Sequence, residues 1–169
     1  VYVMFGQEVY KDRIEMTTED FYRRLVQSSK LPTTTQPSPG DFLEAYKKLA
    51  GEANEILVIN LSSKLSGTYQ SAVQAQKLMA GNNVRIEVVD SQTVVMGLGL
   101  IVLTAARLAQ QGAKLDDLLS FVRGAMPRAH SIMAFDTLKY LAKGGRIGKA
   151  QGLLGSMLSI KPILTIRDG

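Results

Sequence analysis

The chain has 169 residues, of which 46% are hydrophobic and 21% are charged, the balance of an ordinary globular protein with room for one core. Its net charge of +5 is scattered, and without tryptophan or a basic run interleaved with aromatic residues it does not indicate nucleic-acid binding. The absence of cysteine excludes disulfides, thiol catalysis and zinc–thiolate sites, and it is compatible with the cytoplasmic location that we expect. No apolar run approaches the roughly 20 residues that span a bilayer.

Strand-like and helix-like runs alternate along the chain. Continuous apolar runs predict buried strands, and cap residues before amphipathic runs predict helices. The predicted strands cover residues 1–5, 56–61, 84–89, 131–135 and 161–166. The predicted helices cover residues 17–28, 38–50, 69–79, 98–110, 115–126 and 147–159, and a loop rich in threonine and proline is predicted at 31–38.

This order predicts an α/β fold with a three-layer arrangement, in which a parallel sheet is flanked by helices. Ligands bind to such sheets beyond the carboxyl ends of the strands. The segments 60–68 and 90–97 leave strand ends directly, and the segment 31–38 leads into a helix. We therefore expect all three segments at one edge of the sheet.

The segment Ser62–Thr68 lies between a predicted strand and a predicted helix. A turn at this place gathers unpaired N–H groups, hydroxyls and the positive end of a helix dipole, a combination that suits a carboxylate or a phosphate. Helix capping by Ser66 or Thr68, with Gly67 allowing the turn, accounts for the same residues. The sequence alone leaves both interpretations open.

Two other segments carry hydroxyls or carboxylates near predicted strand or helix ends. Thr33–Thr35 are three successive hydroxyl residues ahead of Pro37, which stiffens the backbone, so they form either a rim for an anion or a solvated loop that ends in the helix cap Ser38. Asp90 ends a strand, where it either orients neighbouring hydroxyls or caps the next helix, and we favour the cap.

A third candidate is the glycine-rich segment Lys143–Lys149. Its glycines allow sharp turns that expose Arg146, whose fork of donors suits carboxylates and phosphates. The alternative is a glycine-broken helix junction with solvated charges.

The sequence predicts no catalytic residue, no metal and no cofactor. His130 is the only histidine, Ser66 lacks a Gly-x-Ser-x-Gly turn, and no histidine and carboxylate residues have metal-ligand spacing. One alternative is an enzyme acting on a small acyl or phosphorylated substrate with Ser66 as nucleophile, although no general base lies near Ser66 in the sequence. Another is a regulatory interaction domain without a ligand.

Seven segments, taken in order and spacing, resemble the DegV family of bacterial fatty-acid-binding proteins, which includes the binding subunits of fatty acid kinase. The resemblance covers nearly the whole chain. The segments are Pro32–Pro39, Leu61–Ala72, Val89–Ser91, Met96–Gly99, Phe135–Leu138, Gly144–Lys149 and Ile160–Leu164.

The resemblance implies two α/β domains with a fatty acid between them, its acyl chain in an apolar tunnel. Residues 1–128 would form the first domain without its first strand, and residues 129–169 the start of a second α+β domain, so the chain would be truncated at both ends. By motif, Thr34 and Ser66 resemble the hydroxyls that bind the carboxylate, with the Gly67 N–H nearby. Thr35 stands where the family often has serine.

The resemblance also implies partners. The ligand would be a long-chain fatty acid, whose uptake would involve transient membrane contact. A fatty acid kinase subunit would phosphorylate the presented carboxyl group, and Arg146 matches the arginine associated with engagement of that subunit. The protein would then present a substrate and would not itself catalyse a reaction.

Overall fold

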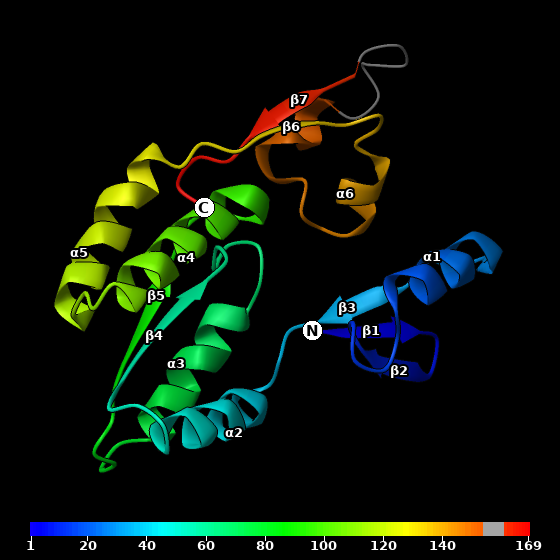
Figure 1. Cartoon of the computed structure of the whole chain (residues 1–169). Helices are drawn as coiled ribbons and strands as arrows, with labels where there is room; N and C mark the ends of the chain where they lie inside the picture. Colours follow the sequence, from blue (N-terminus) through cyan, green and yellow to red (C-terminus); the bar gives the residue numbers. More distant parts are fainter. Residues whose placement is uncertain (154–160) are drawn as a thin grey trace.

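A computed structural model describes residues 1–153 and 161–169. Its central part is a parallel pair of strands covered on both faces by helices (Figure 1). The strands pair in register from Glu55 opposite Arg85 to Asn60 opposite Asp90. The elements of this part are α2 (Pro39–Ala50), β4 (Glu55–Asn60), α3 (Thr68–Leu78), β5 (Arg85–Asp90), α4 (Val95–Gln110) and α5 (Leu115–Ala125).

Alternate side chains of β4 point to the two faces of this sheet. Ile56 and Val58 pack in one cluster with Tyr46 of α2, with Ala75 of α3 and with Met79, which follows that helix. The residues between and after them, Leu57 and Ile59, pack in a second cluster with Ile101 and Ala105 of α4 and Val122 of α5. Both faces of the strand are therefore apolar, as a parallel sheet between helices requires. The predicted three-layer α/β arrangement is confirmed.

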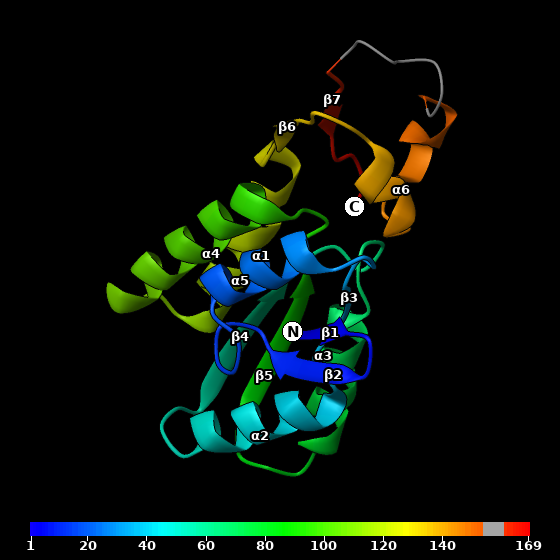
Figure 2. The ribbon, with the colours of Figure 1, turned by 90° about the vertical axis from the view of Figure 1, so that its right-hand side faces the viewer.

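The first 35 residues form a separate antiparallel sheet with strand order β2-β1-β3. In Figure 1 this unit stands to the right of the parallel sheet, and Figure 2 shows it in front of that sheet. Part of the predicted loop 31–38 is a strand, because its threonines pair with β1. Its elements are β1 (Tyr2–Phe5), β2 (Glu8–Lys11), α1 (Thr18–Gln27) and β3 (Thr33–Thr35).

The short connection from β3 to α2 ends in the predicted cap. The Ser38 Oγ accepts the Asp41 N–H, and the Asp41 carboxylate accepts the Ser38 N–H at 2.8 Å, which completes a capping box. The same carboxylate accepts a hydrogen bond of 2.7 Å from the Tyr2 hydroxyl, so it joins the antiparallel sheet to α2. Hydrogen bonds to this carboxylate from the Tyr2 hydroxyl, the Ser38 hydroxyl and the Ser38 N–H lower the Asp41 pKa to about 2, with the bond from Tyr2 as the largest cause.

The last part of the chain lies above the parallel sheet in Figure 1. Its antiparallel strands confirm the predictions at 131–135 and 161–166 with shorter bounds. The predicted helix 147–159 is a 3-10 helix over the described residues 148–153, and its remainder lies outside the described residues. The elements are η1 (Met126–Arg128), β6 (Ile132–Ala134), α6 (Lys139–Lys143), η2 (Gly148–Leu153) and β7 (Ile163–Thr165).

The contact between this last part and α4 depends on a glycine. A Cβ on Gly97 would lie 2.5 Å from the Ser131 Oγ and 2.7 Å from the Thr93 Oγ1. Both hydroxyls are buried, and Ser131 also donates to the Val94 carbonyl at 3.4 Å. Gly97 therefore allows α4 to approach the start of β6.

Candidate functional site

The turn from β4 to α3 is held against the turn that follows β5. The Ser62 N–H donates to the Thr93 carbonyl at 2.9 Å, and the Ser63 N–H donates to the Asp90 Oδ1 at 3.2 Å. Asp90 Oδ1 also accepts the Gln92 N–H at 3.0 Å. Val94 is the N-cap residue of α4 and makes no side-chain cap, so our expectation that Asp90 caps this helix is wrong. Asp90 instead connects the two strand-end turns.

At the start of α3, helix capping is incomplete. Gly67 is the N-cap residue and has no side chain to accept a hydrogen bond. The Ser66 Oγ accepts the Thr68 N–H at 3.3 Å and lies 2.8 Å from the Thr68 Oγ1. Within the described part of the chain, the N–H groups of Gly67, Tyr69 and Gln70 have no hydrogen-bond partner. The turn thus offers several donors at the positive end of a helix dipole, where a carboxylate binds favourably.

Arg146 lies beside this turn. Its Nε donates to the Leu65 carbonyl at 3.3 Å, and its Nη1 donates to the Gly144 carbonyl at 2.6 Å. Gly145, with a φ of 72°, allows the chain to turn sharply just before the arginine. This cation is 81 positions from Leu65 in sequence, and it binds the carbonyl of the residue that precedes Ser66. It adds positive potential to a site already rich in N–H donors.

Gln36 brings the β3–α2 connection to the same place. A Cβ on Gly67 would lie 2.8 Å from the Gln36 Nε2, so the amide covers the Cα of Gly67. Thr34 lies two residues earlier, in β3, with an exposed side chain that makes no hydrogen bond among the described residues. The structure therefore places Ser66 and Gly67 in one turn, with Arg146 bound to the carbonyl of the preceding Leu65. Thr34 lies two residues before Gln36, whose amide lies against Gly67.

Sequence reasoning missed two polar residues at this edge. Gln36 was part of the threonine and proline segment, but its position over Gly67 depends on tertiary contacts. Asn60 is the last residue of β4 and is buried, and its Nδ2 has no hydrogen-bond partner among the described residues. Asn60 could have been found from the sequence, because it is a polar residue at the end of a mostly apolar strand.

The described residues supply no general base to Ser66. The neighbours of its hydroxyl are the Thr68 hydroxyl and N–H. His130 is exposed and forms no hydrogen bond within the described chain. No group of three or more histidine or acidic residues among those described could hold a metal ion. None of the described helices is both long and apolar enough to cross a membrane.

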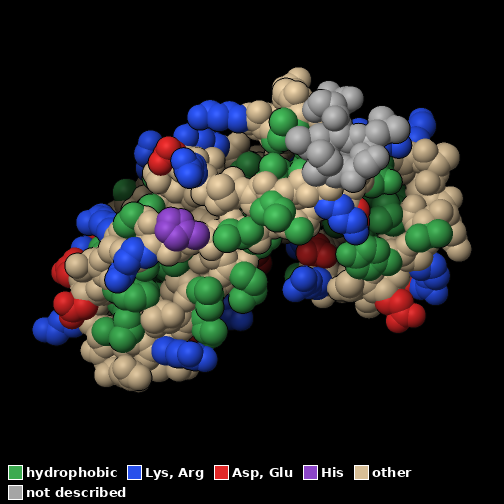
Figure 3. Space-filling view, turned by 90° about the horizontal axis from the view of Figure 1, so that it is seen from above, with side chains coloured by type: hydrophobic (Ala, Val, Ile, Leu, Met, Phe, Trp, Pro, Cys, Tyr) green, Lys and Arg blue, Asp and Glu red, His purple; other side chains and the backbone are tan. Residues whose placement is uncertain are grey.

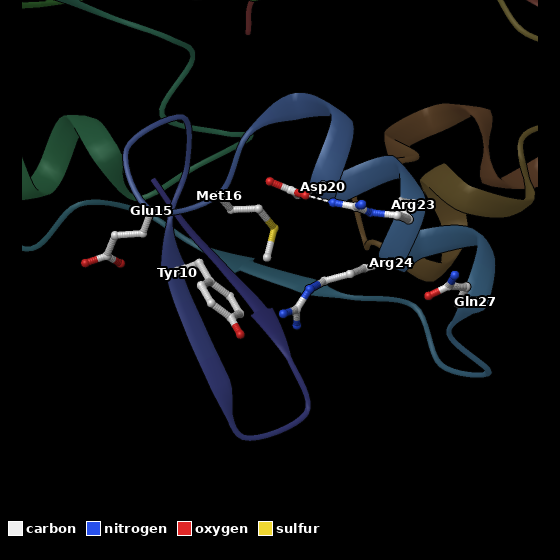
Figure 4. Close-up of a pocket in the computed structure, with 7 residues that line it drawn as sticks. All are labelled: Tyr10, Glu15, Met16, Asp20, Arg23, Arg24 and Gln27. Atoms are coloured by element: carbon white, nitrogen blue, oxygen red, sulfur yellow. Dashed lines mark hydrogen bonds and ion pairs between the residues drawn. The ribbon is translucent and has the colours of Figure 1, made fainter.

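A hollow of about 600 Å³ on the antiparallel unit has a different character (Figure 4). Its two arginines are already paired, because Arg23 bonds to Asp20 and Arg24 donates to Glu8 at 2.7 Å. The Arg24 guanidinium also lies over the Tyr10 ring at 4.9 Å. Paired charges leave little potential for an anion, so this hollow is a weaker candidate than the turn at Ser66.

A second groove, of about 370 Å³, is apolar and lies between β4 and the helices α4 and α5. Leu57 and Ile59 form its floor beside small residues of α4 such as Ala105. This groove lies on the sheet face that carries α4. The polar Asn60 continues the row of Ile56 and Val58, which belongs to the opposite face, against α3.

The fold and this turn define an α/β protein whose strand ends offer unpaired N–H and hydroxyl donors to a small anion. A family model described as "Uncharacterised protein, DegV family" matches residues 1–169. The chain belongs to the DegV family.

Relatives and solved structures agree with this membership. The chain is 45% identical over 160 residues to a DegV domain-containing protein of Caldanaerobacter subterraneus, covering 95% of this chain and 56% of the relative. A fatty-acid-binding DegV family protein from Thermus thermophilus has a TM-score of 0.88 at 38% identity, with 99% of this chain and 59% of that one covered. A stearic acid-binding protein from Eubacterium ventriosum has a TM-score of 0.89 at 27% identity, with the same two shares. The chain thus spans less than three fifths of each.

Proposed function

We propose that the protein binds a long-chain fatty acid whose carboxylate lies at the Ser66–Gly67 turn. The observation that carries this proposal is the set of N–H groups at the start of α3 that have no hydrogen-bond partner among the described residues. These donors offset the desolvation of a carboxylate and fix its direction. The fatty-acid ligands of the related proteins from Thermus thermophilus and Eubacterium ventriosum support the same ligand class.

The exposed face of α4 offers apolar surface on which the tail of the ligand can pack. Met96, Leu100 and Leu103 follow one side of this helix and are 67%, 58% and 48% exposed. The helix begins beside the turn, because Thr93 accepts the Ser62 N–H. Each methylene buried on such a surface contributes about 0.8 kcal/mol, so the tail would supply most of the affinity.

The strand pair β6–β7 offers a second apolar surface near the turn. Ile132 and Ile163 lie on its exposed face, and Figure 3 shows hydrophobic side chains among Lys and Arg side chains when the molecule is seen from above. From β7 the chain continues to Gly169, where a Cβ would lie 2.7 Å from the Ser62 Oγ. Apolar surface with a basic border suits an amphipathic anion.

On this proposal the protein is a carrier that acts in the cytoplasm and delivers its ligand to a fatty acid kinase subunit. Residues 1–128 and 129–169 belong to two domains that enclose the tail, and Arg146 lies where the partner would approach the carboxyl group. We expect Arg146→Ala to retain lipid binding and to slow phosphorylation by the partner. Normal phosphorylation of lipid bound to this variant would contradict the role of Arg146.

The proposal is tested with Ser66→Ala and Thr34→Ala in the full-length protein. Each variant loses a hydrogen bond to a charged group, so we expect fatty acid affinity to fall roughly 10- to 100-fold. A fatty alcohol of equal chain length serves as the control ligand, and its affinity should change little. Isothermal titration or displacement of a fluorescent fatty acid measures both. Equal losses for acid and alcohol would refute the placement of the carboxylate.

The alternative of an enzyme with Ser66 as nucleophile predicts turnover or a covalent adduct with the protein alone. It gains no support from the neighbours of Ser66, because neither the Thr68 hydroxyl nor its N–H is a general base. A native mass spectrum of the full-length protein separates the candidates, since a released lipid of fatty-acid mass supports the carrier and an adduct on Ser66 supports the enzyme. A spectrum with neither a released lipid nor an adduct would favour the third interpretation, a regulatory interaction domain without a ligand.

A further inference from the structure

The glycine at position 67 is explained by a contact. Gly67 has a φ of −72° and a ψ of 5°, which any L-residue adopts, so backbone conformation does not require glycine. The space that a Cβ would fill is occupied by the Gln36 side chain, with the Nε2 at 2.8 Å and the Cδ at 3.2 Å. An amide group therefore lies directly against the backbone of the proposed carboxylate site.

The backbone of Gln36 is held on both sides. Before it, Thr35 is paired with Tyr2 in the antiparallel sheet, and the Thr35 hydroxyl donates to the Gln36 carbonyl at 3.3 Å. After it, Pro37 restricts Gln36 to extended conformations, and Ser38 is fixed by its capping box. The backbone that carries the amide is thus held by a stiff segment beside Gly67.

The Gln36 amide itself makes no hydrogen bond among the described residues. Its Nε2 is nearer to the Gly67 Cβ position than its Oε1, at 2.8 Å against 3.7 Å, so the donor end faces the turn. An amide donor without a partner among the described residues thus lies against Gly67, and it comes from a different part of the chain.

We propose that Gln36 is a head-group ligand that selects a carboxylate, with its amide donating to the carboxylate oxygen bound at the Gly67 N–H. This inference rests on the proposed fatty-acid function and assigns it a head-group residue beyond Thr34, Ser66 and Gly67. Because the amide is neutral, it stabilises the anion without forming an ion pair. It also connects the strand that carries Thr34 to the turn that carries Ser66.

The first test replaces Gln36 in the full-length protein and compares palmitic acid with hexadecanol. Gln36→Glu places a carboxylate against the ligand carboxylate, so palmitic acid affinity should fall at least about tenfold while hexadecanol affinity changes less than about twofold. Gln74→Glu makes the same charge change at an exposed position of α3 and is the matched control. Unchanged palmitic acid binding by Gln36→Glu, or an equal loss with Gln74→Glu, would overturn the inference.

The second test is a double-mutant cycle between positions 36 and 67. Gly67→Ala places its Cβ 2.8 Å from the amide and should displace it, so this variant and Gln36→Ala should each weaken palmitic acid binding by roughly tenfold. The double variant should be no weaker than either single variant, since both remove the same contact. Additive losses would contradict the assignment.

Failure of this inference is distinguishable from failure of the proposed function. If the unaltered protein binds palmitic acid and Ser66→Ala selectively weakens that binding, the function stands whatever the Gln36 variants do. If the unaltered protein binds neither lipid, the function and this inference both fail. Thermal unfolding of each variant, measured by circular dichroism, shows whether an altered affinity follows from a loss of folded protein.

Discussion

Replacing glycine by alanine at two neighbouring positions of α4 should change the free energy of unfolding in opposite directions. At Gly97, an added Cβ would lie 2.5 Å from the Ser131 Oγ and 2.7 Å from the Thr93 Oγ1. Ser131 is 7% and Thr93 is 3% exposed, so neither hydroxyl has free space to move into. At Gly99, the nearest atom to the added Cβ is the Met96 Sδ at 3.7 Å, an ordinary contact.

The expected magnitudes follow from these distances. Gly97→Ala costs about 1–3 kcal/mol for overpacking and about 1 kcal/mol for disturbed hydrogen bonds, offset by about 1 kcal/mol of helix propensity. We therefore expect a net loss of about 1–3 kcal/mol in the free energy of unfolding. Gly99→Ala meets no close atom and should gain about 0.5–1 kcal/mol.

Urea unfolding of the full-length protein, followed by circular dichroism, measures both free energies. Adding Ser131→Ala to Gly97→Ala removes the closest atom and should recover part of the loss, whereas Ser131→Ala alone loses its hydrogen bonds to Thr93 and Val94. If Gly97→Ala were as stable as Gly99→Ala, the close approach of α4 to Ser131 would be wrong.

Three further predictions concern hydrogen bonds near the site. Asp90→Ala removes the acceptor shared by two loop N–H groups and should lower the free energy of unfolding by about 1–3 kcal/mol, whereas Asp90→Asn keeps an acceptor and should lose less in the same urea assay. Ser38→Ala breaks the capping box and should cost about 1 kcal/mol, so an unchanged urea midpoint would contradict that box. Tyr2→Phe should raise the Asp41 pKa from about 2 towards the ordinary 3.8, as measured by an NMR pH titration. Because the Asp41 pKa is depressed, the hydrogen bond from Tyr2 stabilises the folded protein above the ordinary carboxyl range, and this stabilisation is lost as the pH falls towards 2. Identical acid unfolding of Tyr2→Phe and the unaltered protein would exclude this contribution.

Features that depend on near neighbours in sequence were predictable. The cap of α1 at Thr17 and the capping box at Ser38 and Asp41 join residues three positions apart, so the residue types alone indicate them. The buried strand β4 was also predictable, because a continuous apolar run suits a strand covered on both faces.

Other features required partners that lie far away in the chain. The segment containing Thr34 was predicted as a loop because threonines and prolines favour one, and it became a strand by pairing with Val3 and its neighbours. Asp90 was expected to cap the helix that follows it, and it instead accepts the N–H of Ser63, 27 positions earlier. Local pattern carries no information about which distant backbone group is free to pair.

The sequence by itself determined which residue types are available for an anion: hydroxyls at positions 34 and 66, a glycine at 67 and an arginine at 146. Only the tertiary structure decided that Arg146 reaches the Leu65 carbonyl and that the Gln36 amide covers Gly67. The physical reason is that hydrogen bonds and van der Waals contacts act over a few ångströms in space. Residues separated by 31 or 81 positions meet only after sheet pairing and helix packing have brought their backbones together.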